Sequence, residues 1–185
     1  MTGGQTDRVE ESLVEWLQSA GYKESRTIEK FMEHVFLAEV LQECWFRRRQ
    51  VVEVLHAEVD AAGYDLILQT EHVVRHVQLK ATRKGSKTQR QIINRKLSAR
   101  EGGCVVWTTY AIDEETFRTR LTYRWWDGTQ KELPDRPARH TRGPKAIRPG
   151  TALLTRGDFE TVATTAELVD MLFPKDGLPP RGARR

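Results

Sequence analysis

The sequence has little cysteine and no long apolar run. Cys44 and Cys104 are the only two cysteines, which is too few for a disulfide framework, and neither has a close partner at metal-ligand spacing. We therefore expect both to be small buried residues in a reducing compartment. No apolar stretch reaches the roughly 18 residues of a membrane span, and residues 1–7 lack the pattern of a secretory signal. A cytoplasmic location without a membrane partner is expected.

A strong overall charge is also absent. The chain has 30 Lys and Arg against 26 Asp and Glu, a net charge of +4, which does not by itself indicate nucleic acid. A length of 185 residues with 38% hydrophobic residues favours one globular domain with a real core.

One local absence is informative, because no Asp or Glu occurs between His72 and Arg100. The basic residues of that stretch are Arg75, Lys80, Arg83, Lys84, Lys87, Arg90, Arg95, Lys96 and Arg100. A run of one sign suits the phosphate backbone of a nucleic acid. A solvated basic helix is the alternative.

Alternating apolar and polar residues in 63–68 and 76–80 predict two antiparallel strands joined by a short turn. Residues two apart on a strand share a face about 6.6 Å apart, so Gln78 and Lys80 project together. If Asp65 pairs onto that face, a carboxylate, a carboxamide and an ammonium meet, and the group could hold a hydrated divalent metal beside a phosphate. An ordinary hairpin with one solvated face is the alternative.

Apolar residues recurring from Ile28 to Cys44 predict a helix that precedes these strands. Ser25 or Thr27 is expected to cap its start, and the pattern ends at Arg47–Arg49. These three arginines suit either a phosphate contact or the negative end of the helix dipole.

Glu39 is the notable polar residue of this helix. At 100° per residue it falls within about 20° of Ile28, so its carboxylate is expected to point towards the core. A buried carboxylate needs a partner, which is either the hairpin site or an interior Arg or Lys such as Lys80. Glu43, one turn later, is the rival if the helix is rotated.

Gly63–Tyr64–Asp65 followed by Gln78–Leu79–Lys80 resembles the core signature of the PD-(D/E)xK nuclease superfamily. It resembles the variant in which Gln replaces the middle acidic residue and a Glu on the preceding helix takes part. The resemblance covers about residues 27–111. It implies an α/β, restriction-endonuclease-like core, with a mixed central β-sheet flanked by helices in a single domain.

The resemblance also implies a set of site residues. Asp65 and Glu39 are expected to hold Mg²⁺, with Mn²⁺ as a substitute, together with the Leu79 backbone carbonyl. Gln78 is expected to add its amide oxygen or orient water, and Lys80 to position the attacking water or stabilise charge on the phosphate. Because Gln78 is neutral, the site carries less negative charge unless Glu39 points inward.

The function implied is a metal-dependent nuclease that hydrolyses phosphodiester bonds. It is expected to be a DNA endonuclease in restriction or defence, mobile-element maintenance or repair, and a homodimer if it cuts both strands. Glu58 or Asp60 is a possible aid to a second metal or a water. The expected contacts to nucleic acid are Arg83, Lys84, Lys87, Arg90, Arg95 and Lys96.

Two other functions remain open. One is a catalytically inactive nucleic-acid-binding module of the same fold. The other is metal-independent RNA cleavage by an acid/base pair such as His76 and Lys80. Loss of cleavage in chelator separates the metal-dependent enzyme from this last possibility.

The rest of the chain gives weaker signals. Trp125 and Trp126 are expected to pack over the sheet, with stacking on unpaired bases as the alternative. The segment 133–150 combines prolines with basic residues and is expected to be a long surface segment. The other expected elements are a strand in 50–60, a helix over 88–100, strands over 104–110 and 119–126, and a helix over 166–173.

These signals divide the chain into four parts. They are an N-terminal helix and extension (1–24), a nuclease-like core (25–112), an additional strand, basic Pro-rich loop and C-terminal helix of the same domain (113–175), and a disordered basic tail (176–185).

Overall fold

The computed structural model describes residues 24–57, 63–139 and 146–177. Within these residues the longest helix is α2 (Ser25–Gln42), which continues as a π-helical turn, η1 (Glu43–Arg48). A second helix, α3 (Thr165–Leu172), comes near the end of the chain. Two 3-10 turns, η2 (Arg95–Ala99) and η3 (Arg156–Asp158), connect strands.

The centre of the protein is a mixed six-stranded sheet. Its strands, in spatial order, are β1 (Glu53–His56), β2 (Leu66–Gln69), β3 (Val74–Arg83), β5 (Gly103–Ile112), β6 (Thr119–Asp127) and β8 (Glu160–Val162). β3 and β5 are parallel, and the other neighbours are antiparallel. A second, two-stranded antiparallel sheet is formed by β4 (Arg90–Asn94) and β7 (Thr151–Thr155).

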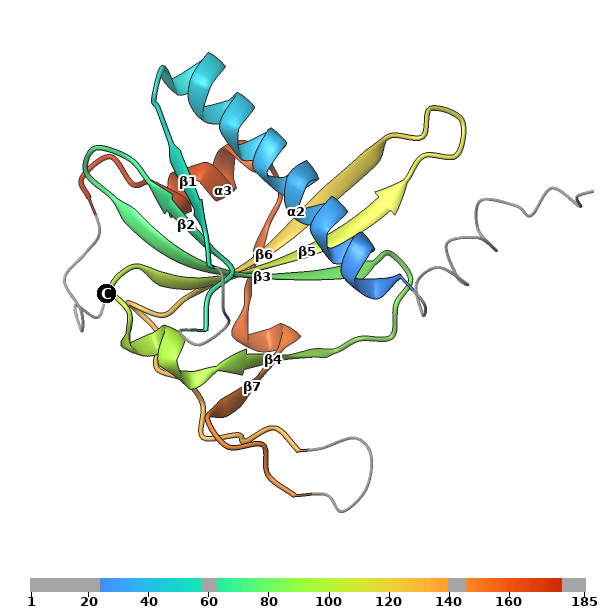
Figure 1. Cartoon of the computed structure of the whole chain (residues 1–185), viewed down its shortest axis with the longest axis vertical. Helices are drawn as coiled ribbons and strands as arrows, with labels where there is room; N and C mark the ends of the chain where they lie inside the picture. The colour runs from blue at the N-terminus through green and yellow to red at the C-terminus, as the bar shows by residue number, and fades with distance from the viewer. Residues whose placement is uncertain (1–23, 58–62, 140–145, 178–185) are drawn as a thin grey trace, which may run out of the picture.

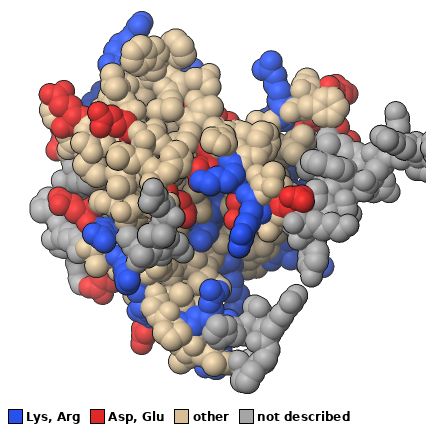
Figure 2. All heavy atoms as spheres, viewed as in Figure 1, with Lys and Arg blue, Asp and Glu red and all other residues tan. Residues whose placement is uncertain are grey.

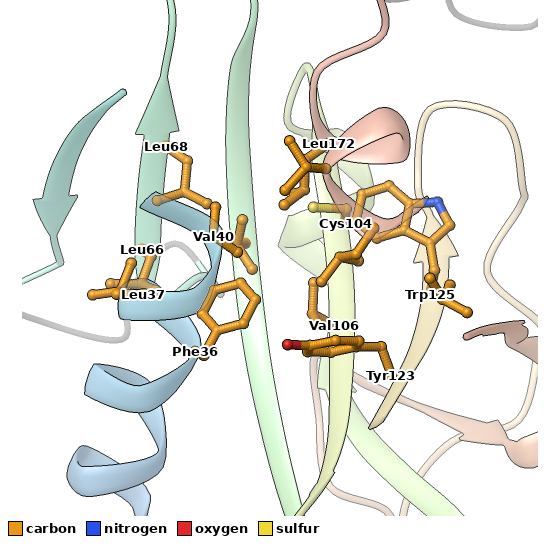
Figure 3. Packing of buried hydrophobic residues seen from close by; sticks show 14 of the residues in the cluster. Phe36, Leu37, Val40, Leu66, Leu68, Cys104, Val106, Tyr123, Trp125 and Leu172 are labelled. Carbon is orange, nitrogen blue, oxygen red and sulfur yellow. The ribbon is translucent and has the colours of Figure 1, made fainter. Parts of the chain in front are cut away.

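Three layers result from this arrangement. In Figure 1, α2 and α3 lie above the main sheet, and β4 and β7 lie below it. The larger core fills the space between the helices and the sheet, and Figure 3 shows part of it, including Phe36, Val40, Leu66, Val106 and Trp125. A smaller core between the two sheets contains Ile93, Leu97, Val105, Trp107, Trp126, Ala152, Leu154 and Phe159.

β3 presents different residues to these two cores. Val77 and Leu79 belong to the helix side, where both pack in the larger core. Gln78 faces the small sheet and accepts a bond from the Asn94 backbone N–H. Lys80 is on the same face, since its register partner on β5 is Trp107 of the smaller core. The predicted shared face of Gln78 and Lys80 is confirmed.

Several predicted elements are confirmed. β2 and β3 form the expected hairpin, β5 lies beside it, and α3 is the expected last helix. Trp125 and Trp126 are 3% and 1% exposed, so they pack in the cores and are not free to stack on bases. Cys44 and Cys104 are buried free thiols, and burial raises the pKa of the first to about 11 and of the second to about 12.

The helix predicted over 88–100 is wrong. The chain there forms β4 and then η2, so the crossover from β3 to the parallel strand β5 carries a strand and a 3-10 turn. Ile92 and Ile93 are β-branched residues that favour extended backbone, and Ile93 is buried against the main sheet while pairing with Ala152 of β7. The predicted caps are also wrong, because the residue before α2 is Glu24 and no side chain caps the helix.

Arg75 has a structural role that its place in the basic run does not suggest. It is 1% exposed, and its guanidinium donates to the Leu172 and Met171 carbonyls at the end of α3, at 2.8 and 2.6 Å. It also pairs with Asp127 at 3.4 Å. Arg75 therefore fixes α3 to β3 and β6 and is not available to a phosphate.

Some predictions lie outside the described residues. These are the N-terminal helix, the roles of Glu58 and Asp60, residues 140–145 of the Pro-rich segment and residues 178–185 of the tail. The described part of 133–150 contains one isolated bridge, between Arg139 and Ile147, and a buried Ala138.

Candidate functional site

An open cleft of about 1060 Å³ lies where the N-terminal half of α2 approaches β3 beyond the start of β2. Its lining residues are Arg26, Glu29, Lys30, Glu33, Ala57, Tyr64, Asp65, Leu79, Lys80, Ala81, Arg90, Gln91 and Ile92. Charged residues of both signs thus surround it. Figure 2 shows Lys and Arg side chains gathered at the centre of this face, with Asp and Glu side chains beside them.

Asp65 occupies the point where β2 and β3 separate. Its backbone N–H donates to the Val77 carbonyl at 2.9 Å, and β2 begins at the next residue. The next N–H of β3 on this side, that of Leu79, donates instead to Asp65 Oδ2 at 2.7 Å. The carboxylate therefore takes the place of a main-chain acceptor and is held at the edge of the cleft.

Gly63 sets the approach of the chain to Asp65. Its φ is +83°, and a Cβ there would lie 2.7 Å from Cβ of Asn94. Both the left-handed backbone and the contact require glycine. The first and last residues of the Gly63–Asp65 signature are thus explained by local geometry.

Lys80 lies on β3 at the edge of the cleft, two residues beyond Gln78. It lines the cleft with Asp65 and is half-buried. Its backbone carbonyl accepts from Thr108 Oγ1 at 3.1 Å, which fixes the main chain against β5. The structure therefore brings Asp65 and Lys80, two of the predicted site residues, to one cleft.

Glu33 is a cleft residue that the sequence reasoning missed. It is only 6% exposed, and its Oε1 accepts from Lys30 Nζ at 2.7 Å and lies 3.1 Å from His56 Nε2. The available signal was helical spacing, since residues 26, 29, 30 and 33 form a charged stripe on one face of α2. That stripe faces the cleft.

The prediction that Glu39 meets the hairpin residues is wrong. Glu39 does point inward, but it accepts hydrogen bonds from the Tyr123 hydroxyl and from Thr165 Oγ1, the latter at 2.9 Å. These contacts lie on the helix side of the sheet, opposite the face of Lys80, and Figure 3 shows the Tyr123 hydroxyl directed towards α2. Burial and the bond to Glu39 raise the pKa of Tyr123.

Glu39 does not reach the cleft because of the way α2 is rotated about its own axis. Six residues at 100° each separate Glu39 from Glu33 by about 120° around the axis, so the two cannot face one cleft. Glu39 lines a separate hollow of about 320 Å³ together with Glu43. Glu43, the rival candidate, pairs with Arg47 at 3.4 Å and is not at the cleft either.

Gln78 and His76 are also away from the cleft lining. Gln78 is 4% exposed, and its Oε1 accepts from the Asn94 N–H at 3.4 Å, so it joins β3 to β4. His76 Nδ1 lies 2.8 Å from the Glu101 carbonyl oxygen, and the ring packs edge-on against Tyr64. Because four residues of a strand separate them, the Cα atoms of His76 and Lys80 are about 13 Å apart.

The six predicted nucleic-acid contacts have different surroundings. Arg90 is exposed and is the one of the six that lines the cleft. Lys84 and Lys87 are exposed on the segment between β3 and β4, and Arg83 is half-buried. Lys96 is exposed in η2. Arg95 instead holds the Thr151 carbonyl at 3.1 Å and Asp135 at 3.2 Å.

The oxygen donors of the cleft suit a hard cation such as Mg²⁺. The described residues contain no group of three or more His, Cys, Asp or Glu arranged to hold a metal ion. Mg²⁺ commonly rests on one or two carboxylates and completes its shell with water and substrate phosphate. The carboxylates that line the cleft are those of Asp65, Glu29 and Glu33.

The chain matches none of the family models and none of the curated proteins with which it was compared. Among the helices of the described residues, none is both long enough and apolar enough to cross a membrane.

Proposed function

We propose that the protein is a metal-dependent nuclease that hydrolyses phosphodiester bonds, acting on DNA as an endonuclease with a restriction-endonuclease-like core. The observation that carries this proposal is the convergence of Asp65 and Lys80, from two strands that separate, on an open cleft walled by α2. The α/β layering and the mixed sheet are compatible with that core. The strand in the β3–β5 crossover is a departure from it.

The cleft has the charges that a phosphodiester substrate requires. Lys80 and Arg90 line it from β3 and β4, and Arg26 lines it from α2. Cations on two walls attract a polyanionic strand and fix its phosphate between them. The Lys80 ammonium is suited to orient the attacking water or to stabilise the charge that develops on the phosphate oxygens.

The acidic residues of the cleft are the proposed metal ligands. Asp65, with its carboxylate held by the Leu79 N–H, and Glu33, oriented by Lys30 and His56, are the residues that would hold Mg²⁺ or Mn²⁺. The Leu79 carbonyl is a further candidate ligand. A bound ion would supply Lewis acidity and a water of lowered pKa. In this assignment Glu33 replaces Glu39, and Gln78 has no direct part.

One observation favours a second candidate, the catalytically inactive nucleic-acid-binding module. The described residues lack a cluster of three metal ligands, and Glu33 already accepts from Lys30. A cleft that binds phosphate through its cations without a tightly held ion would bind nucleic acid and leave it intact. The separation of about 13 Å between His76 and Lys80 gives the RNA-cleaving pair no support.

The test is incubation of the protein with supercoiled plasmid, single-stranded DNA and RNA, each with Mg²⁺, Mn²⁺ or a chelator. We expect nicking of plasmid with either metal, none in chelator and none with Lys80→Ala. Lys131→Ala, which changes an exposed lysine outside the cleft lining, is the matched control and should cut like the wild type. Binding without cleavage under every metal would favour the module, and neither binding nor cleavage would refute both.

A further inference from the structure

A second basic cluster lies outside the cleft lining, against Trp107. Arg124 belongs to β6, and Arg156 begins η3 directly after β7. Their guanidinium carbons lie 5.6 and 5.7 Å from the centroid of the Trp107 ring. Trp107 itself is fully buried, so the two arginines cover it from segments that are distant in the sequence.

The two guanidinium groups lack the acidic partners that such a cluster normally has. Within the described ranges, neither arginine forms an ion pair with a carboxylate. Asp158, two residues after Arg156, is instead held by Arg136 at 2.6 Å and by the Thr155 N–H at 2.6 Å. The local positive charge is therefore not balanced by these neighbours.

Arg156 also has a buried donor without an acceptor. Its Nε is inaccessible to solvent and has no hydrogen-bond partner among the described residues. Burial and the positive charge of Arg156 lower the pKa of Arg124. An orphan donor and two neighbouring like charges both cost free energy, and contact with Trp107 offsets only part of it. An anion bound to the outer N–H groups of the two guanidinium groups would offset the like-charge cost, whereas the buried Nε of Arg156 is out of its reach.

The strand register connects this cluster to the cleft. Lys80, Trp107 and Arg124 are register partners on three adjacent strands and so share one face of the sheet. With strands about 4.8 Å apart, the Cα atoms of Lys80 and Arg124 are roughly 10 Å apart. Arg156 is held at the same side, since its N–H donates to the Gln89 carbonyl at 3.0 Å, next to the cleft residue Arg90.

We propose that Arg124 and Arg156 form a phosphate-binding subsite for a backbone phosphodiester of a nucleic-acid strand, near the phosphate that Lys80 contacts. The subsite rests on the proposed function, because that function supplies the strand. Guanidinium groups recognise phosphate through paired hydrogen bonds. Trp107 is covered and cannot stack on a base, so the contact positions the strand without reading its sequence.

The experiment measures binding and cleavage separately. Short fluorescein-labelled single-stranded and duplex DNA is titrated in chelator, with fluorescence anisotropy as the readout, over a range of salt concentrations. Arg124→Gln and Arg156→Gln are each expected to weaken binding about tenfold. The plot of log affinity against log salt has a negative slope. Each variant is also expected to make this slope shallower by about 0.7 to 0.9, the value for one lost phosphate contact.

Two further variants distinguish a phosphate contact from a structural role. Arg124→Lys keeps the charge over Trp107 and should keep the salt slope even if its affinity falls. Arg118→Gln, at an exposed arginine on the β5–β6 turn, should bind like the wild type. Thermal unfolding of every variant shows which of them are folded.

The outcomes separate the two proposals. If folded Gln variants bind with wild-type affinity and slope while the wild-type protein cleaves DNA, the subsite is refuted and the nuclease stands. If the Gln variants lose binding but no metal supports cleavage, the subsite stands and the nuclease fails. Absence of any binding by the wild-type protein would overturn the subsite directly.

Discussion

Replacement of Asp65 by Asn separates the chemical role of this residue from its structural one. In the structure Asp65 Oδ2 accepts the Leu79 N–H at 2.7 Å, at the point where β2 leaves β3. Asn keeps a side-chain oxygen of the same reach, so this hydrogen bond survives, but the negative charge is removed. Ala removes both the charge and the acceptor.

The expected stability changes follow from this hydrogen bond. A hydrogen bond to a charged group contributes about 1 kcal/mol more than a neutral one, so Asp65→Asn should cost roughly that amount. For a protein of this size this lowers the melting temperature by about 2 to 4 °C. Asp65→Ala leaves the Leu79 N–H without this acceptor and should cost about 1 to 3 kcal/mol.

The expected effect on activity is much larger. Because Asp65 would hold the metal ion in the proposed site, loss of its charge is expected to reduce the rate by about 10²-fold or more, since residues that only support a metal ligand already contribute about 10- to 100-fold. The assay is plasmid nicking in Mg²⁺ beside thermal unfolding of the same samples, with Asp176→Asn at an exposed carboxylate as the control. Asp65→Asn protein that is folded and cleaves as fast as the wild type would refute the role of this carboxylate.

Two other predictions follow from the contacts described above. Glu33→Gln should reduce cleavage strongly, whereas Glu39→Gln should leave it near the wild-type rate, because of these two residues Glu33 lines the cleft and Glu39 does not. A nicking assay in which Glu39→Gln loses more activity than Glu33→Gln would contradict our assignment. Arg75→Leu should lower the free energy of unfolding by about 3 to 5 kcal/mol, because it leaves buried Asp127 without its partner and the end of α3 without its donors. Urea unfolding measures this change, and a loss below about 1 kcal/mol would exclude the proposed role of Arg75.

The hairpin and its polar residues were predictable from local sequence. Alternation with a period of two fixes which residues share a strand face, and this is why Gln78 and Lys80 were correctly placed together. Glycine at position 63 and the acidic residue two positions later also have local causes, a left-handed backbone and the separation of two strands. The close approach of Gly63 to Asn94, which also requires glycine, depends on the tertiary structure instead.

The incorrect prediction of a helix over 88–100 shows where local sequence pattern was insufficient. The apolar residues at 92, 93 and 97 fit a helical stripe as well as a short strand, and the choice was made by pairing with β7, which lies far later in the chain. Charge pattern failed in a similar way for Arg75. A run of basic residues does not indicate which of its members is buried by a helix that comes near the end of the chain.

The sequence by itself determined that Asp65 and Lys80 belong to one hairpin and that a helix carrying Glu39 and Glu43 precedes it. Only the tertiary structure decided which carboxylate faces the cleft, because helical periodicity gives relative angles but not the rotation of α2 on the sheet. That rotation is set by packing of Phe36 and Val40 against residues of β2, β5 and β6. It directs Glu33 to the cleft and Glu39, about 120° away, to Tyr123.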